Sequence, residues 1–291
     1  MTLRKRSLSL GWYPQDAEQV RGFLADFPRQ TRSARAAVAP HAGWAYSGSI
    51  AAAGVTALDS QADTVVVIGG HLPAGLPPLF AEEDEFASPF GNMEMDRELR
   101  SLVRKEWSRK CFRRGTAPDR YTDNTVEVLI PMVHYFFPQA WLLWFRLPAE
   151  IAAFEAGKIL FQVGKSLNRN LVVLGSTDLT HYGDHYDFSP MGTGKKALDW
   201  VREVNDRRFI ETLLEGNAEK ILEQALEDRS ACSVGAVLGA LGFTQAAGAS
   251  QGELLAYGTS ADSNAPGQET PESFVGYAAV KWSPPGDLTP L

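Results

Sequence analysis

Three of the five histidines follow short apolar segments of the kind that form buried β-strands. His41 follows Ala36-Ala-Val-Ala, His71 follows a run that starts at Thr64, and His181 lies shortly after a run that starts at Leu171. Imidazole is a common metal ligand and the usual proton carrier near neutral pH. A single loop histidine is most often structural, but three at equivalent strand ends predict one shared metal-type or redox-type site.

Cys232 is the fourth candidate, in the segment Ser230-Ala-Cys-Ser-Val-Gly-Ala. It lies at the predicted start of a helix, where a thiol is shifted toward the thiolate that binds metal or attacks an electrophile. A free cysteine also serves often as a small buried hydrophobe, and the local sequence alone favours that role. The only other cysteine, Cys111, has an unrelated context, which argues against a disulfide framework.

Two carboxylates near these residues have open interpretations. Asp178 could orient an imidazole or lie in the pocket, or it could cap the turn after its strand. Glu127 opens an apolar helical segment in which an unpaired carboxylate would be costly to bury, so it could face the pocket or cap its helix. Of the remaining histidines, His134 is expected to pack within that segment, and His185 is expected in a loop outside the site.

The elements that must position these residues show an alternation of strands and helices. Apolar runs predict strands at 36–39, 64–69, 140–146, 171–175, 253–257 and 274–282. This pattern predicts an α/β fold with a mostly parallel central sheet flanked by helices. Ligands of such sheets bind beyond the carboxyl ends of the strands, which is where the candidate residues lie.

Helices are predicted from about Ser49, over about 151–167, and through most of 196–243 with a break at Gly216-Asn217. The segment 259–272 is rich in Ser, Asn, Pro and Gly and predicts a surface loop between the last two strands. No linker is long enough to divide the chain. A single domain over residues 1–291 is therefore expected.

The composition is that of an ordinary globular protein, with 44% hydrophobic and 22% charged residues among 291. A net charge of −7 and the absence of a long basic stripe disfavour nucleic acid as a partner. No stretch approaches the roughly 18 apolar residues of a membrane span, and the first residues do not resemble an export signal. We therefore expect a cytoplasmic protein that does not bind a membrane.

The segment Pro40-His-Ala-Gly-Trp-Ala-Tyr-Ser-Gly48 is similar to the motif P-H-A-G-[YW]-x-Y-S-G of the MEMO family, called AmmeMemoRadiSam system protein B in bacteria and archaea. The resemblance covers nearly the whole chain. Further matching motifs are Gly11-Trp-Tyr-Pro14, Gly70-His71, Ser88-Pro-Phe-Gly91 with Asp96, Ser176-Thr-Asp-Leu-Thr-His-Tyr-Gly183, Cys232, Tyr257-Gly-Thr-Ser260 and Val275-Gly-Tyr-Ala-Ala279.

The family resemblance implies a fold like the catalytic subunit of class III extradiol dioxygenases, which hold non-haem iron. It implies iron or copper binding and an oxidoreductase or dioxygenase-like activity, with association with radical-SAM and AMMECR1-type proteins. Some members have been regarded as non-catalytic proteins whose pocket receives a phosphopeptide. Carried over by position, the family's metal-pocket residues fall on His41, His71, Asp178, His181 and Cys232.

The leading hypothesis is a mononuclear metal site with His41, His71 and Cys232 as ligands. Mixed imidazole and thiolate ligation suits Fe(II) or copper, with zinc as a further option. His181, Asp178 and Glu127 are the expected catalytic residues beside the metal.

Two alternatives remain open. A cysteine-hydrolase arrangement would use Cys232 as nucleophile, His181 as base and Asp178 as orienter. A non-catalytic binding or scaffold protein would use the same pocket for a peptide or a small molecule.

Asn124 favours the second alternative, because many family members carry E-H-S-x-E where this chain has Asp123-Asn-Thr-Val-Glu127. An amide does not titrate, so Asn124 cannot replace a histidine that acts as acid or base. Likewise Gly70-His71-Leu72 replaces a fuller Ser-His-His run, which removes another imidazole.

Overall fold

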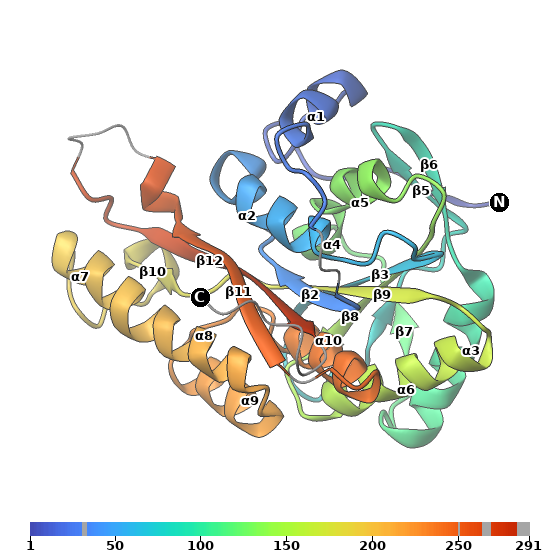
Figure 1. Cartoon of the computed structure of the whole chain (residues 1–291). Helices are drawn as coiled ribbons and strands as arrows, with labels where there is room; N and C mark the ends of the chain where they lie inside the picture. Colours follow the sequence, from blue (N-terminus) through green and yellow to red (C-terminus); the bar gives the residue numbers. More distant parts are fainter. Residues whose placement is uncertain (31–33, 250, 264–268, 284–291) are drawn as a thin grey trace.

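Four parallel strands form the centre of the protein. The computed structural model describes residues 1–30, 34–249, 251–263 and 269–283. The central strands lie side by side in the order β2 (Ala36–Ala39), β9 (Leu171–Ser176), β3 (Thr64–Leu72) and β8 (Trp141–Pro148). Their carboxyl ends therefore meet at one edge, as the sequence pattern predicts (Figure 1).

Antiparallel strands extend the sheet on both sides, so the sheet is mixed. On one side β12 (Phe274–Ser283) runs antiparallel to β2 and pairs with β11 (Gln251–Thr259) and the short β10 (His181–Tyr182). On the other side β4 (Leu79–Phe80) pairs with β8, and β7 (Ala117–Pro118) pairs with β4. A separate small sheet contains β1 (Leu3–Arg4), β5 (Glu85–Ser88) and β6 (Gly91–Glu94).

Helices cover both faces of the central strands (Figure 1). One face of β3, with Val66 and Ile68, packs toward α3 (Arg97–Lys110), α6 (Ala152–Ser166) and α10 (Val234–Ala246). The opposite face, with Val65 and Val67, packs toward α1 (Ala17–Leu24), α2 (Trp44–Thr56) and α5 (Ile130–Phe136). Burial on both faces explains why the central strands are apolar without alternation.

A long helical segment flanks β11 and β12, the strands that extend the sheet beyond β2 (Figure 1). It runs through α7 (Lys195–Trp200), a π-helical turn (Val201–Asn205) and α8 (Asp206–Glu215), and α9 (Ala218–Glu227) follows it. The predicted break at Gly216-Asn217 is confirmed. Gly216 ends α8 with φ 69°, and the Asn217 side chain caps α9 by accepting from the Lys220 N–H.

The expected strands are all present, and one expectation about the helices needs correction. α2 begins at Trp44 rather than near Ser49, because the Trp44 N–H donates to the Trp12 carbonyl and starts the helix directly after Gly43. The predicted loop 259–272 connects β11 to β12 as expected and contains a 3-10 turn, Ser260–Ser263, while 264–268 lie outside the described residues.

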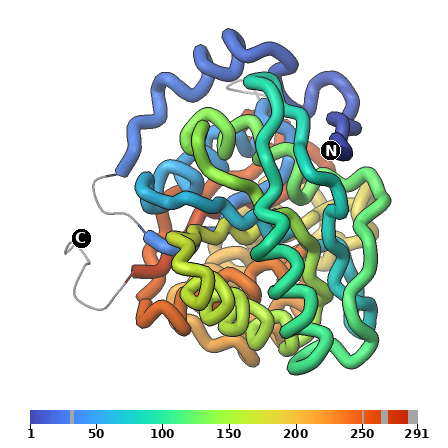
Figure 2. Tube along the Cα trace, turned by 90° about the vertical axis from the view of Figure 1, so that its right-hand side faces the viewer, coloured from blue at the N-terminus to red at the C-terminus, as the bar shows by residue number. Residues whose placement is uncertain are grey.

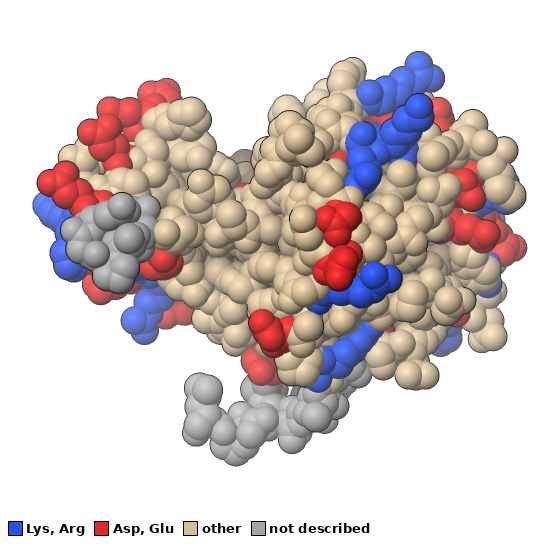
Figure 3. Space-filling model, turned by 90° about the horizontal axis from the view of Figure 1, so that it is seen from above, with Lys and Arg blue, Asp and Glu red and all other residues tan. Residues whose placement is uncertain are grey.

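The N-terminal segment, residues 1–24, is dark blue in Figure 2. It crosses the outer side of the molecule beside α2 and α5. On the face shown in Figure 3, Lys and Arg side chains are interspersed with Asp and Glu. Within the described ranges, no helix combines the length and the apolar character that crossing a bilayer requires.

Candidate metal centre

His41 lies directly beyond the end of β2 and is buried, with 1% of its surface exposed. Its Nδ1 lies 2.8 Å from the hydroxyl of Ser176, the last residue of the neighbouring strand β9. Its Nε2 lies 3.3 Å from the Cys232 Sγ. The parallel pairing of β2 with β9 thus sets the ring orientation and directs Nε2 toward the thiol.

His71, the penultimate residue of β3, has a left-handed conformation with φ 56°. A side chain with a Cβ rarely adopts this conformation, and such strain is found where surrounding contacts hold the backbone. Here the His71 N–H donates to the Ser233 hydroxyl at 3.2 Å. Gly70 allows this approach, because a Cβ at position 70 would overlap with the Ser233 side chain.

The His71 ring donates from Nδ1 to the Asp123 carboxylate at 3.2 Å, and about a third of the side chain is exposed. A carboxylate is an acceptor only, so Nδ1 carries a proton, and Nε2 is the atom that a metal ion would bind in place of its proton. Burial lowers the pKa of His71, but hydrogen bonds with Asp123 and Cys232 outweigh it and raise the pKa to about 10.

Cys232 directly precedes the Ser233 N-cap of α10. Its Sγ accepts from the Asp178 N–H at 3.3 Å, and its own N–H donates to the Asp178 carbonyl at 3.2 Å. Burial raises the pKa of the thiol, but the charge and hydrogen bond of His41 and the hydrogen bond of His71 lower it to about 6. The thiolate is therefore the main form at neutral pH.

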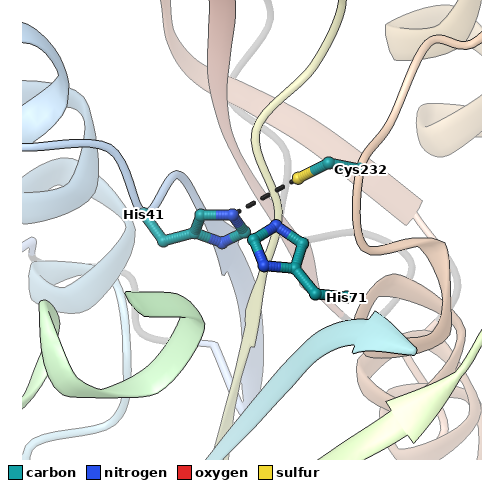
Figure 4. Close-up of side chains that lie close together, drawn as sticks. All are labelled: His41, His71 and Cys232. Carbon is teal, nitrogen blue, oxygen red and sulfur yellow. Dashed lines mark hydrogen bonds between the residues drawn. The ribbon is translucent and has the colours of Figure 1, made fainter. Parts of the chain in front are cut away.

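His41, His71 and Cys232 point toward one another from three different segments (Figure 4). One ligand atom from each lies within 4.8 Å of the other two. Metal bonds of about 2.0 Å to nitrogen and 2.3 Å to sulfur join atoms up to about 4.3 Å apart, so small side-chain rotations would complete a site. The three residues thus form a group that could hold a metal ion, and the donor set fits one.

Asp178 and His181 lie beside this group. The Asp178 carboxylate accepts from the His41 N–H at 2.7 Å, and its second oxygen lies 3.9 Å from His41 Nε2. His181 donates from Nδ1 to the Leu179 carbonyl at 3.1 Å, so its Nε2 is an acceptor. Burial raises the pKa of the Asp178 carboxyl group. Burial also lowers the pKa of His181, against the charge of Asp178, and this favours the neutral imidazole.

A cleft of about 470 Å³ opens beside Asp178 and His181. It lies between the start of α2 and the loops around β10 and β12. The other residues that line it are Trp12, Ala42, Gly43, Tyr46, Asn124, Tyr186, Ser260, Pro271, Ser273, Phe274, Val275 and Tyr277.

Sequence reasoning missed a buried charge network behind His71. Arg146, on β8, holds Asp119 with two hydrogen bonds of 2.9 and 3.0 Å and contacts Asp123 at 3.0 Å. Burial opposes ionisation of Asp123, but hydrogen bonds from His71 and Thr125 and the charge of Arg146 hold its pKa well below the usual range. The available signal was an arginine inside the apolar run at 140–146, which requires a buried acidic partner.

Glu127 does not contact the three ligand candidates, and it is not among the residues that line the cleft. Its carboxylate accepts from the Ser7 and Leu8 N–H groups, the Ser7 hydroxyl and the Tyr13 hydroxyl. The Glu127 carboxylate neither faces the pocket nor caps its own helix, contrary to both expectations. Glu127 instead holds the N-terminal segment, a long-range contact that local sequence does not reveal.

The remaining histidines have the expected positions. His134 is buried, with Nδ1 2.5 Å from the Ser88 hydroxyl, and His185 is exposed in the turn Asp184–Tyr186. The cysteine-hydrolase arrangement requires His181 beside the Cys232 thiol, but the imidazoles that contact this thiol are those of His41 and His71. His181 donates to the backbone instead.

Comparison with known proteins gives one consistent result. The model of the family described as "Memo-like protein" matches residues 4–281. The chain belongs to the Memo-like protein family. A MEMO1 family protein of Pyrococcus furiosus is 27% identical, over 96% of this chain and 98% of that protein. Another from Methanococcoides burtonii is 30% identical, over 84% of each chain.

Within this Memo-like chain, the motif residues lie where the fold requires them. Within the segment 40–48, His41 belongs to the metal centre and Gly43 lines the cleft. Asn124 lines the cleft as well. The Asn124 amide donates to the His41 carbonyl at 3.0 Å. The departure from the Memo-like pattern therefore lies in the site itself.

Proposed function

We propose that this Memo-like protein is a metal-dependent oxidoreductase with Fe(II) or copper bound by His41, His71 and Cys232. The observation that carries the proposal is the convergence of two imidazoles and a thiolate within 4.8 Å, next to a cleft large enough for a small molecule. The metal would supply a redox centre and a Lewis acid. Zinc would supply only the second.

The roles of the protein groups follow from their contacts. Ser176 and Asp123 orient the two imidazoles, which is the usual function of groups that bond the far nitrogen of a metal-binding histidine. His181 is neutral and presents Nε2 as an acceptor, so it would take a proton from a bound substrate. Asp178 would stabilise the resulting imidazolium by its charge.

Elemental analysis tests the metal proposal. Protein purified without chelators or a histidine tag, before and after anaerobic Fe(II) reconstitution, should contain close to one metal ion per chain. His71→Ala and Cys232→Ala should lose it. His185→Ala and Cys111→Ala are matched controls, because His185 is exposed and neither residue belongs to the group of three. Wild-type protein without metal after reconstitution would rule the proposal out.

A second function is favoured by Asn124. This amide lines the cleft where many family members have a titratable histidine, so the pocket could bind a peptide or small ligand without turnover. Metal-loaded protein that consumes no oxygen with any candidate substrate, while Asn124→His gains oxygen uptake, would support this function.

We also propose the cytoplasmic location expected from the sequence and, from the family resemblance, radical-SAM and AMMECR1-type partners. Fractionation of cells, and co-purification of the tagged chain with such partners from the same cells, test these two points. Recovery of the chain in a membrane or extracellular fraction would contradict the location, and repeated failure to recover either partner type would contradict the association.

A further inference from the structure

The cleft beside the metal centre is walled by aromatic rings from four separate segments. Trp12 comes from the N-terminal segment, Tyr46 from α2, Tyr186 from the turn after β10, and Phe274 and Tyr277 from β12. The rings of His181 and Tyr186 meet edge to face, with centroids 4.9 Å apart. Walls of this kind hold a flat ring by stacking and edge contacts.

Basic side chains are missing from the part of the cleft wall that the structure describes. Among the described residues that line the cleft, none is a lysine or arginine, and Asp178 is the one acid. Arg229 lies nearby, but its guanidinium is exposed, donates to the carbonyls of Tyr186 and Asp187 and stacks over Phe188.

Two of the polar side chains that line the cleft, His181 and Asp178, offer acceptor atoms. His181 donates from Nδ1 to the Leu179 carbonyl, so Nε2 of the neutral ring has no proton, and the Asp178 carboxyl group accepts from the His41 N–H. A ligand with a hydroxyl or amino group would satisfy these acceptors. A phosphoryl group carries about two negative charges at neutral pH and would meet them without a lining cation to pair with.

We propose that the cleft binds small planar-ring compounds that carry a hydroxyl or amino donor and no negative charge, and that it excludes phosphorylated ligands. The volume of about 470 Å³ suits one ring with short substituents. A cationic amine would gain further from the aromatic walls by cation–π attraction. This inference rests on the proposed function, because it names the substrate class for the same site.

Three probes of matched shape test the proposal. They are 4-methylphenol, 4-methylphenyl phosphate and 4-methylcyclohexanol, which separate the effects of donor, charge and ring. Binding is measured by calorimetry on both metal-free and zinc-loaded protein. The phenol should bind at least ten times more tightly than either other probe. Equal or tighter binding of the phosphate would overturn the proposal.

Variants link the binding to the cleft. Tyr46→Leu and Tyr186→Leu should each weaken binding of the phenol several-fold and leave the metal content unchanged. Tyr121→Leu is the matched control, because Tyr121 is exposed but does not line the cleft. Phenol binding that survives in metal-free protein would uphold the ligand class even if the metal proposal failed. Phenol binding that neither Tyr46→Leu nor Tyr186→Leu weakens would overturn the proposal that the cleft binds this class of ligand.

Discussion

His71 and Asp123 form a hydrogen-bonded pair at the end of β3, with 3.2 Å between Nδ1 and Oδ2. The pair joins an exposed ligand candidate to a buried network, because Asp123 also contacts Arg146 at 3.0 Å. The imidazole is thereby fixed although a third of its side chain is exposed. Asp119, Glu127 and Asp206 are three further buried carboxylates whose contacts have measurable consequences.

Asp123→Asn should weaken metal binding by about 10- to 100-fold, because an amide oxygen orients the imidazole less strongly than a carboxylate. The affinity is measured by competition with a zinc chelator. Asp123→Glu is the matched control, since it keeps the carboxylate and should retain most of the affinity. An unchanged dissociation constant in Asp123→Asn would contradict the role given to this pair.

Arg146→Met should lower the free energy of unfolding by about 3–5 kcal/mol, because it leaves the buried carboxylates of Asp119 and Asp123 without their cation. Urea denaturation measures the change. Lys158→Met breaks an exposed pair with Glu155 and should cost less than about 1 kcal/mol. Similar losses in the two variants would show that burial of the Arg146 network does not govern its contribution.

Glu127→Gln should loosen the N-terminal segment and cost about 1–3 kcal/mol, because one of its acceptor oxygens becomes a donor facing N–H and O–H groups. Limited proteolysis should cleave within residues 1–14 faster than in wild type. Metal content should stay unchanged. Lost activity or metal with an intact N-terminal segment would instead support the catalytic role first expected of Glu127.

Asp206, the first residue of α8, should make stability depend on pH. Burial raises its pKa from 3.8 to about 6, although Thr180 and Tyr257 donate hydrogen bonds to it. The folded state therefore holds this proton more tightly than the unfolded state, so the contribution is present below about pH 4 and is lost as pH rises through about 6. A rise of this size corresponds to about 3 kcal/mol.

The difference in unfolding free energy between wild type and Asp206→Asn isolates this effect. Between pH 4 and 7, wild type should lose up to about 3 kcal/mol relative to the variant, since asparagine does not titrate. Urea titrations at several pH values provide the measurement. A constant difference across this range would show that Asp206 is not protonated preferentially in the folded protein.

The sequence by itself predicted six strands of the large sheet, the helix over about 151–167, the break at Gly216-Asn217 and the family, but not α1, α3 or the short strands. Strand periodicity and capping are local, so Ala36–Ala39 and the Gly216-Asn217 break were visible without the fold. The rule that parallel strands end at one edge placed His41 and His71 together before any coordinates. Family motifs added Cys232, whose local context alone favoured a structural role.

Only the tertiary structure decided which groups meet these residues. Sheet pairing joins His41 to Ser176, and the loop after β7 brings Asp123 to His71, across separations that no local pattern encodes. The same reason explains Glu127, whose carboxylate contacts residues about 120 positions earlier in the chain. Residue type shows that a buried carboxylate needs partners, and the folded chain alone determines which partners lie within reach.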